Sequence, residues 1–527
     1  MTAHARTSYD QIPYESYPYA QTHPNRMATV AYLLGHRAPP IDRCRVLELG
    51  CANGSNLIPM AATFPHSEYL GIDLSGRQID DGLRLLRKLA LDNISLKRMS
   101  VLDVGAELGR FDYIICHGLY SWVTAEVQDK VLAICADNLN EEGLAFVSYN
   151  TYPGWHARGM IRDMITYHAG DALQPTARLG KARGLLDFLA ESLAREGRPY
   201  GQLLRSEVEA IRSKSDSYLF HEYLEDSNEP VYFHEFARRA GDKGLYYLGE
   251  VDLGTTVAGF FPAEIEMLLQ KMAPDPIRRE QYRDLLLNRR FRQTLLWRKA
   301  STPTFALKLD RLSALHVSSP ARPVEGDSNV GSDVSERFEV PGVTAIDCSE
   351  PIVKAALRHL AEVWPRTVPF DDLCDAARAW LSGASSPAHK EQDTQQLGRF
   401  LLTAHAKSAG RLVELHLYPP TLVVNIASRP VASRLARAQA ETSNTVTNVR
   451  HEPVDLDELG RHLIQLLDGK HNMTDFVEAI LQLTRAGKLV VEEWGRQVTD
   501  EDTLRRLIHI KVEEQLQRLA SYALLVG

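Results

Sequence analysis

The sequence is poor in cysteine and contains no long apolar run. Its six cysteines are scattered, and none forms a C-x-x-C pair. This pattern argues against a zinc ribbon or a secreted disulfide framework and is compatible with a reducing compartment. No 18-residue apolar stretch could cross a membrane, and the polar, aromatic N-terminus has no signal-peptide core. We therefore expect a cytoplasmic protein without membrane insertion, and we predict no metal site.

An excess of positive charge is also lacking. Lys and Arg number 60 against 68 Asp and Glu, which gives a formal net charge of −8. This charge offers no general attraction for nucleic acid, so no nucleic-acid partner is predicted. The short basic run Arg289, Arg290 and Arg292 is expected to be a solvated face. At 527 residues, 44% of them hydrophobic, the chain has the size and composition of a globular protein with two to four domains.

What is present is organised around residues 45–54, which read RVLELGCANG. An apolar strand carrying Glu48 is followed by Gly50 and Gly54 and then by a helix, the order of a nucleotide-binding βα unit. The spacing E-x-G-x-x-x-G offers fewer successive amides to a pyrophosphate than G-x-G-x-x-G does. It therefore favours a small adenosine-type ligand without phosphates.

Strands and helices alternate from residue 45 onward, which predicts an α/β fold with a doubly wound sheet. Five strands are expected at 45–49, 69–72, 94–98, 111–116 and 143–149. A helix at 233–240 and strands at 244–251 and 291–300 would complete seven strands only near residue 300. Segments 156–226 and 262–288 are then helical insertions, and the first is expected to overhang the active site.

Acidic residues follow two neighbouring strands of the predicted sheet. Asp73 ends the second strand and could accept hydrogen bonds from both hydroxyls of a ribose. Asp103, just beyond the third strand, could accept from an adenine amino group. The alternatives are that Asp73 is a charge at a helix N-terminus and that Asp103 is an ordinary loop acid. Ligands of such sheets bind at the carboxyl ends of the strands, so both acids favour a ligand site there.

Taken as an ordered set, ELGCANG, GID and SVLDV resemble the first three motifs of class I S-adenosylmethionine-dependent methyltransferases. The resemblance implies S-adenosylmethionine as the cofactor. It places the glycines at the amino-acid moiety, Asp73 at the ribose and Asp103 at the adenine. The predicted cofactor-binding residues are Glu48, Gly50, Cys51, Asn53, Gly54, Asp73, Leu74, Val101, Leu102, Asp103 and His117.

Two aromatic loops follow the fourth and fifth strands, CHGLYSWV at 116–123 and SYNTYPGW at 148–155. They depart from the (D/N)PPY motif that amino-methylating members often carry. Methyl transfer to an amine requires a neutral nitrogen held near the methyl group with water excluded. Aromatic walls can hold the ammonium form by cation–π contact, and Tyr120, Trp122, Tyr149, Tyr152 and Trp155 could form such a cage.

Within these loops, Asn150 could orient the amine, and His117 or Tyr120 could move its proton. The alternative is that the aromatic side chains only seal the edge of the sheet. No single catalytic base is assigned. The predicted catalytic residues are His117, Tyr120, Trp122, Asn150, Tyr152 and Trp155.

A narrower resemblance spans most of residues 8–300. YDQIPYESYPYAQTHP, HGLYSWV, NTYPGWH, YLFHEYLEDSNEPVYFHEF and RRFRQTLL are together similar to bacterial methyltransferases with a methyltransferase regulatory domain. That family includes rickettsial outer-membrane-protein lysine methyltransferases. The resemblance implies methyl transfer to lysine side chains of a protein, an outer-membrane protein in the rickettsial case. The alternatives are a small-molecule or lipid-linked amine methyltransferase and a non-catalytic cofactor-sensing scaffold. The substrate, the degree of methylation and the oligomeric state, a dimer included, stay open.

The regions outside the predicted sheet complete the domain plan. An N-terminal arm, 8–25, is rich in tyrosine and proline and is expected either to pack on the next domain or to cover the ligand pocket. The predicted domains are 1–155 (cofactor-binding core with the arm), 156–226 (helical insertion), 227–316 (completion of the core and regulatory region), 317–336 (linker) and 337–527 (C-terminal docking domain).

The C-terminal domain is expected to be a mainly helical α+β unit with winged-helix-like elements. Its helices lack a basic recognition face, so we interpret it as a protein-docking module rather than a DNA reader. His451, His462 and His471 are spaced too widely for an obvious metal site and are expected to be solvated or capping residues.

Overall fold

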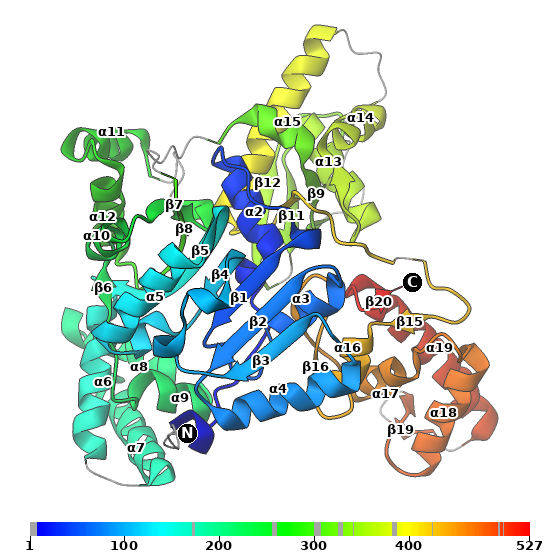
Figure 1. The fold of residues 1–527 in the computed structure, drawn as a ribbon. Coiled ribbons are helices and arrows are strands. Elements are labelled where there is room, and N and C mark those ends of the chain that lie inside the picture. Colours follow the sequence, from blue (N-terminus) through cyan, green and yellow to red (C-terminus); the bar gives the residue numbers. More distant parts are fainter. Residues whose placement is uncertain are drawn as a thin grey trace.

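A twisted sheet forms the centre of the molecule (Figure 1). The computed structural model describes residues 8–170, 174–255, 261–299, 307–324, 330–340, 342–381, 387–423, 425–493, 496–498 and 500–526. The strand order is β3-β2-β1-β4-β5-β8-β7, and a two-residue strand, β6, pairs with the end of β5. The strands are β1 (Arg45–Leu49), β2 (Glu68–Asp73), β3 (Ile94–Arg98), β4 (Phe111–Cys116), β5 (Leu139–Tyr152), β6 (Val231–Tyr232), β7 (Tyr246–Glu250) and β8 (Phe291–Trp297).

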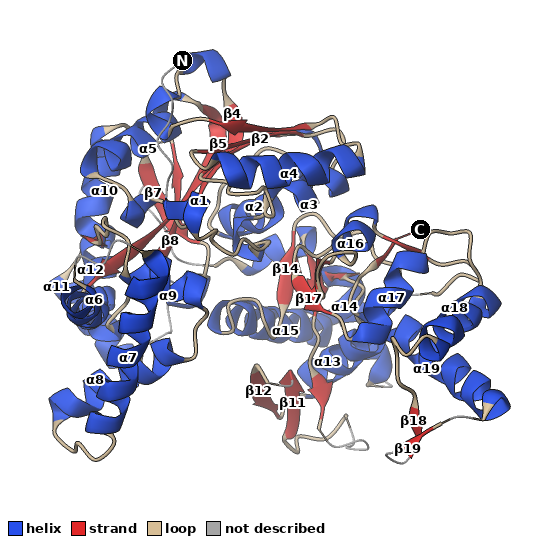
Figure 2. Cartoon of the chain, turned by 90° about the horizontal axis from the view of Figure 1, so that it is seen from below, coloured by secondary structure: helices blue, strands red, loops and turns tan. Residues whose placement is uncertain are grey.

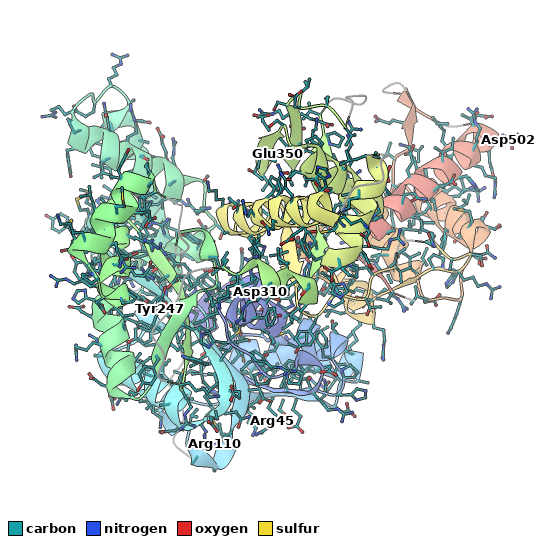
Figure 3. All side chains as sticks on the ribbon, turned by 90° about the horizontal axis from the view of Figure 1, so that it is seen from above. Arg45, Arg110, Tyr247, Asp310, Glu350 and Asp502 are labelled. Carbon is teal, nitrogen blue, oxygen red and sulfur yellow. The ribbon has the colours of Figure 1, made fainter. Side chains whose placement is uncertain are left out.

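The first five strands run parallel, and β8 lies antiparallel between β5 and β7. The predicted seven-strand sheet that closes near residue 300 is confirmed. In Figure 3, Arg45 and Arg110 mark the amino end of β1 and β4, where an Arg45 guanidinium nitrogen lies 2.7 Å from the Arg110 carbonyl oxygen. The ligand edge predicted from the sequence is the opposite, carboxyl end of these strands.

Helices cover both faces of the sheet because its strands are apolar on both sides. Val46 of β1 faces one core, and Leu47 and Leu49 face the other. The first core is covered by α2 (Pro24–Leu33), α3 (Leu57–Thr63) and α4 (Gly76–Leu89), and the second by α5 (Ala125–Asp137) and α10 (Phe233–Asp242).

The first predicted insertion is a helical body that continues directly from β5. Its helices are α6 (Trp155–Ala169), α7 (Pro175–Leu193), α8 (Pro199–Arg212) and α9 (Asp216–Tyr223), and they bury a core of their own around Ile165, Leu186 and Val208. The second insertion forms α11 (Ala263–Met272) and α12 (Pro276–Leu287). Both predicted helical insertions are confirmed.

The expectation of a solvated face at Arg289, Arg290 and Arg292 is wrong. Arg292 points into the protein and is fully buried, with guanidinium nitrogens 2.6 Å from Glu250 and 2.8 Å from Asp284. Arg289 pairs with Asp284, and Arg290 pairs with Glu207. Arg292 lies on β8, and its acidic partners come from β7 and α12, which the sequence pattern of the basic run cannot reveal.

The C-terminal half forms two units (Figure 2). The helices α13 (Pro351–Val363), α14 (Phe370–Trp380) and α15 (Pro387–Lys407) share the first core of the sheet. The last domain has its own core, built by α17 (Glu458–Leu466), α18 (Met473–Arg485) and α19 (Glu501–Ser521). In Figure 2 this domain and the insertion α6–α9 lie on opposite sides of the long helix α15.

Short elements complete the described chain, and some differ from the prediction. Of residues 317–336, expected to be a linker, the described parts 317–324 and 330–336 contribute to β9, β10 and the start of β11, which pair with other strands. Residues 325–329 lie outside the described residues. The short elements are α1 (Ser8–Gln11), β9 (His316–Ser318), β10 (Arg322–Pro323), β11 (Glu336–Val340), β12 (Thr344–Cys348), β13 (Val368–Pro369), β14 (Glu414–His416), β15 (Val431–Ala432), α16 (Arg434–Gln439), β16 (Thr445–Thr447), β17 (Pro453–Asp455), β18 (Glu492–Glu493), β19 (Arg496–Gln497) and β20 (Leu525–Val526).

Candidate active site

The first two backbone amides of the glycine turn after β1 are hydrogen-bonded within the protein. The amides of Gly50 and Cys51 both donate to the carbonyl oxygen of Ile72, at 2.9 and 3.0 Å. Gly50 and Gly54 have a φ of 76°, a backbone conformation that favours glycine. A ligand at this turn would meet bare backbone rather than a set of free donors, which suits a ligand without phosphates.

Asp73 fastens the glycine turn to the end of β2. One carboxylate oxygen accepts from the amide of Ala52 at 2.9 Å, and the other accepts from the amide of Ser75 at 2.8 Å. Burial raises the pKa of Asp73, and the two backbone hydrogen bonds oppose that rise. The helix α4 is capped by the Ser75 side chain, so Asp73 is not needed as its cap. Each Asp73 oxygen keeps a lone pair for a ligand hydroxyl.

Two large apolar side chains stand exposed beside Asp73. Leu74 and Leu102 are each 42% exposed, and Asp103 lies exposed in the same turn as Leu102 and Val101. Exposed leucines next to acceptor groups are suited to the faces and the amino edge of an adenine ring. The structure thus places the predicted adenine residues at the carboxyl edge of the sheet.

Two predicted residues shape the turn through packing and local hydrogen bonds. Cys51 is buried, and its sulfur lies so close to Gly71 that a Cβ at that glycine would approach it to 2.7 Å. The Asn53 side-chain oxygen accepts from both the amide and the hydroxyl of Ser55, at 3.1 and 2.6 Å. In this structure the side chains of Cys51 and Asn53 support the turn.

Glu48 presents an unpaired carboxylate oxygen inside the site. The side chain is 4% exposed, and its Oε1 accepts from the Asn56 amide group at 2.8 Å. Its Oε2 is buried without a hydrogen-bond partner among the described residues. Burial raises the pKa of Glu48 to about 8. A buried acceptor without a partner beside the glycine turn fits the ammonium group of an amino-acid moiety.

His117 and Asn150 lie on the same side of the sheet, next to the arm. The Nδ1 of His117 lies 2.9 Å from the Ser148 hydroxyl, which also accepts from the Gly118 amide. The hydroxyl proton is therefore available to Nδ1, and burial lowers the pKa of His117 to about 4. The Asn150 side-chain nitrogen is buried without a partner among the described residues. His117 is thus a neutral group at pH 7, and Asn150 has a donor to spare.

Two of the five aromatic residues predicted to form the cage, Tyr120 and Tyr149, do not belong to it. Tyr120 and Tyr149 are 0% and 1% exposed and pack against Phe236 in the second core. Side chains alternate along β5, so Tyr149 faces the helices α5 and α10 while Asn150 faces the other side. For Tyr120, a predicted catalytic residue, the structure matches the alternative that the ring seals the sheet.

The other three aromatic residues gather where β5 runs into α6. The rings of Trp122 and Trp155 meet edge to face at 6.2 Å, and the Trp155 indole donates to the Asn228 side chain at 2.8 Å. Tyr152 stacks on His156 at 4.2 Å. A cavity of about 570 Å³ opens beside them, with Tyr152, Trp155, His156 and Asn228 in its lining.

The sequence prediction missed His156, Asn228 and Tyr232. Tyr232 packs beside Tyr152 at 5.2 Å and belongs to β6, which extends the sheet next to the end of β5. His156 follows directly on the loop at 148–155 that supplied the predicted cage, and Asn228 and Tyr232 lie in SNEPVY, which served for the resemblance alone. The clustering of aromatic and amide residues in both stretches is the sequence signal that could have indicated these three residues.

The N-terminal arm joins the insertion to the cofactor edge. Tyr9 stacks on His221 of α9 at 4.4 Å, and a carboxylate oxygen of Asp10 accepts from the Ser75 hydroxyl at 2.7 Å. The ring of Tyr19 meets that of His117 at 4.2 Å. The arm therefore packs on the domain that follows and also runs along the edge that carries Asp73.

The described ranges contain no cluster of metal ligands and no helix suited to span a membrane. In them, no three His, Cys, Asp or Glu side chains converge in a way that could hold a metal ion. None of the helices they contain is both long and apolar enough to cross a bilayer.

Comparison with known proteins agrees with this fold. Residues 47–145 match the family described as "Methyltransferase domain", 215–298 match "Predicted methyltransferase regulatory domain", and 428–524 match "PKMT, C-terminal winged helix domain". The regulatory-domain match includes β7 and β8, the two strands that complete the sheet. The fold and these matches define a methyltransferase.

Similar proteins cover the whole chain. Uncharacterized protein RP789 of Rickettsia prowazekii is 32% identical over 526 residues, 98% of this chain and 93% of the relative. Uncharacterized protein RP028 of the same organism is 40% identical over 238 residues, 45% of this chain and 95% of the relative. The structure of PKMT2 from Rickettsia typhi in complex with AdoHcy superposes with a TM-score of 0.88 at 30% identity, covering 98% of this chain and all of that one.

The chain therefore belongs to the family of S-adenosylmethionine-dependent methyltransferases that carry a methyltransferase regulatory domain and a PKMT winged-helix domain. The predicted winged-helix-like elements of the C-terminal domain are confirmed.

Proposed function

We propose that the protein transfers methyl groups from S-adenosylmethionine to lysine side-chain amines of a protein substrate. S-adenosylmethionine is the cofactor, in keeping with the AdoHcy (S-adenosylhomocysteine) held by the related PKMT2. The observation that carries the proposal is the cavity lined by Tyr152 and Trp155 where β5 runs into α6. It accompanies the acceptors Glu48 and Asp73 near the carboxyl ends of β1 and β2. An aromatic cavity suits the long, apolar stem and the cationic head of a lysine.

In this proposal the two ends of the cofactor are held by different acceptors. Asp73 receives the ribose hydroxyls, while Leu74 and Leu102 cover the adenine and Glu48 receives the ammonium group. The bound cofactor supplies an electrophilic methyl group on a sulfonium. These side chains would hold the cofactor at the carboxyl edge of the sheet, the edge at which the loops after β4 and β5 begin.

The acceptor amine must lose its proton before methyl transfer and must meet the methyl group with water excluded. His117 is neutral at physiological pH, so it does not repel a cationic lysine. Asn150 has an unused side-chain donor at the same edge. The rings of Trp122 and Trp155 exclude water from the approach and hold the ammonium form until its proton leaves for solvent. The protein substrate itself, an outer-membrane protein in the rickettsial resemblance, is a proposal that only labelling can test.

The test is to incubate the protein with radiolabelled S-adenosylmethionine and with cytosolic or cell-envelope extracts. Label in precipitable protein that maps to lysine by mass spectrometry supports the proposal. Label found only in small molecules or lipids would favour the amine alternatives and overturn protein methylation. Saturable cofactor binding without any turnover would favour the scaffold.

Replacing Trp155 by phenylalanine is expected to lower turnover by roughly tenfold while leaving AdoHcy affinity unchanged. An aromatic ring stays, although a smaller one, but the indole donor to Asn228 is lost, so the cavity wall is no longer held in place. Turnover of labelled protein and AdoHcy binding by calorimetry measure the two effects. Trp380, a partly exposed residue of α14, provides the matched control as Trp380→Phe. Equal turnover in the Trp155 variant and the control would contradict a role at the acceptor.

Replacing Glu48 by glutamine is expected to change two measurements in opposite directions. The pKa of Glu48 is raised to about 8, so the ligand-free protein loses stability as the pH rises from about 4.5 through 8 and the buried group ionises. Glutamine removes that cost, and the melting temperature at pH 8 should exceed that of the wild type. The rise in melting temperature on adding AdoHcy should shrink, since the acceptor of the ammonium group is weaker. An undiminished AdoHcy response would exclude Glu48 from the cofactor site.

The cysteines support a cytoplasmic location for this activity. All six are free thiols buried in the protein, which is compatible with a reducing compartment. We further propose that the C-terminal domain docks a protein partner.

A further inference from the structure

One residue of the winged-helix domain reaches into the catalytic part of the molecule. His451 lies in the turn between β16 and β17 and was expected to be solvated or capping, but it is only 4% exposed. Its Nε2 lies 2.8 Å from the side-chain oxygen of Asn56, just before α3. The two residues are 395 positions apart in the chain. The expectation for His451 is therefore wrong, and His471 serves as its contrast, since its side chain is 42% exposed.

Asn56 connects His451 to Glu48. The Asn56 side-chain nitrogen donates to Glu48 Oε1 at 2.8 Å and to the Thr22 hydroxyl at 2.9 Å. The Asn56 oxygen accepts from the Tyr19 amide at 2.9 Å, in addition to its contact with His451. All of these side chains except that of Tyr19 are almost completely buried.

Hydrogen-bond chemistry fixes the direction of the Asn56 amide. A backbone N–H, that of Tyr19, faces its oxygen, and a carboxylate, that of Glu48, faces its nitrogen. With the amide reversed, the nitrogen would face the Tyr19 donor and the oxygen would face the Glu48 carboxylate. His451 adds a second donor through Nε2–H, a tautomer assigned from this network. Burial lowers the pKa of His451 well below its usual value, so the ring is neutral.

We propose that His451 is a positioning residue for the cofactor. Through Asn56 it holds the Glu48 carboxylate in the orientation that receives the ammonium group. The cofactor site is then complete only when the winged-helix domain is docked on the catalytic domain. This inference rests on the proposed placement of the cofactor beside Glu48.

Other contacts hold the winged-helix domain and the segment before it against the catalytic domain. Leu435 and Ala438 of α16 share the first core with Leu86 and Leu89 of α4. Lys88 at the end of α4 forms an ion pair with Glu441. The contact of His451 is therefore one part of a larger interface between the winged-helix domain and the catalytic domain.

The experiment measures AdoHcy affinity of the full chain by calorimetry. His451→Asn is the disrupting variant, because asparagine tolerates the left-handed backbone at this position, where φ is 63°, but is too short to reach Asn56. We expect about a tenfold loss of AdoHcy affinity, the effect of one buried hydrogen bond. His451→Gln carries a donor at similar reach and should restore affinity to within about threefold of the wild type. A purely structural role would not be rescued selectively in this way.

His471→Ala is the control within the same domain and should bind AdoHcy like the wild type. Asn56→Ala should lose at least as much affinity as His451→Asn, and the double variant should lose no more than Asn56→Ala alone. Circular dichroism and melting temperature establish that each variant is folded. If His451→Asn does not fold, the comparison of His451→Gln, Asn56→Ala and their double variant tests the same dependence.

Two results would overturn the proposal. One is wild-type AdoHcy affinity in folded His451→Asn, and the other is fully additive losses for His451→Asn and Asn56→Ala. The proposed placement of the cofactor beside Glu48 and Asp73 is tested separately from the coupling to His451. If Asp73→Ala and Glu48→Gln weaken AdoHcy binding but His451→Asn does not, only the coupling is wrong. If none of the three weakens it, the placement of the cofactor is wrong.

Discussion

Replacing Arg292 by methionine is expected to destabilise the folded protein by about 3–5 kcal/mol, because removal of the guanidinium leaves buried carboxylates without their counter-charge. Glu250 and Asp284 lie 2.6 and 2.8 Å from the Arg292 nitrogens, and Glu280 lies 3.3 Å away. All of these side chains are 3% exposed or less. Urea denaturation followed by tryptophan fluorescence measures the loss.

Arg238→Met provides the matched control for Arg292. Arg238 pairs with Asp242 at 2.9 Å along α10, but both side chains are more than 60% exposed. Such an exposed pair contributes little, so the expected change is below about 1 kcal/mol. If both variants lost the same small amount, the Arg292 cluster would not contribute to stability. The interpretation would also fail if the Arg292 loss were fully recovered by raising the salt concentration, since screening acts mainly on exposed charges.

Replacing Asp73 by alanine is expected to weaken AdoHcy binding by about 100-fold. The carboxylate can receive two ribose hydroxyls, and hydrogen bonds to charged groups contribute about 1.5–3 kcal/mol each. The substitution also frees the Ala52 and Ser75 amides, which loosens the glycine turn. Calorimetric titration with AdoHcy measures the dissociation constant directly and requires no methyl acceptor.

Two variants bracket this result. Asp80→Ala removes an exposed acid of α4, the helix that follows Asp73, and should leave AdoHcy binding unchanged. Asp73→Asn keeps one acceptor oxygen but loses the charge, so its affinity should fall between those of the wild type and Asp73→Ala. Equal AdoHcy affinity for Asp73→Ala and the wild type would refute the ribose assignment.

The sheet and the cofactor edge could be predicted from the sequence because their signals are local. Each strand is a short apolar run, and parallel strands bring their carboxyl ends to one edge. Glu48, Asp73 and Asp103 were therefore placed at that edge without knowledge of any contact. The same alternation rule separates Tyr149 from Asn150, and its use on β5 would have removed Tyr149 from the predicted cage.

The contacts of His451 and Arg292 could not be predicted in this way. The acid partners of Arg292 lie up to 42 positions away on the neighbouring strand and helix, and Asn56 lies 395 positions from His451. A single histidine in a polar turn carries no sign of what it will meet in the folded chain. Periodicity reports which face of an element is apolar, and it is silent about which distant element packs against that face.

The long-range contacts of the N-terminal arm affect when the arm can fold during translation. Residues 8–22 are synthesised before the partners they contact: the carbonyl oxygen of Ile12 accepts from His221, which is synthesised 209 residues later. The amide of Tyr19 donates to the side-chain oxygen of Asn56, which also contacts His451, a residue synthesised much later. Contacts this far apart form late and slow the final stage of folding. A nascent chain can build the central strands early, but the arm at 8–22 can complete these contacts only after residue 451 has been translated.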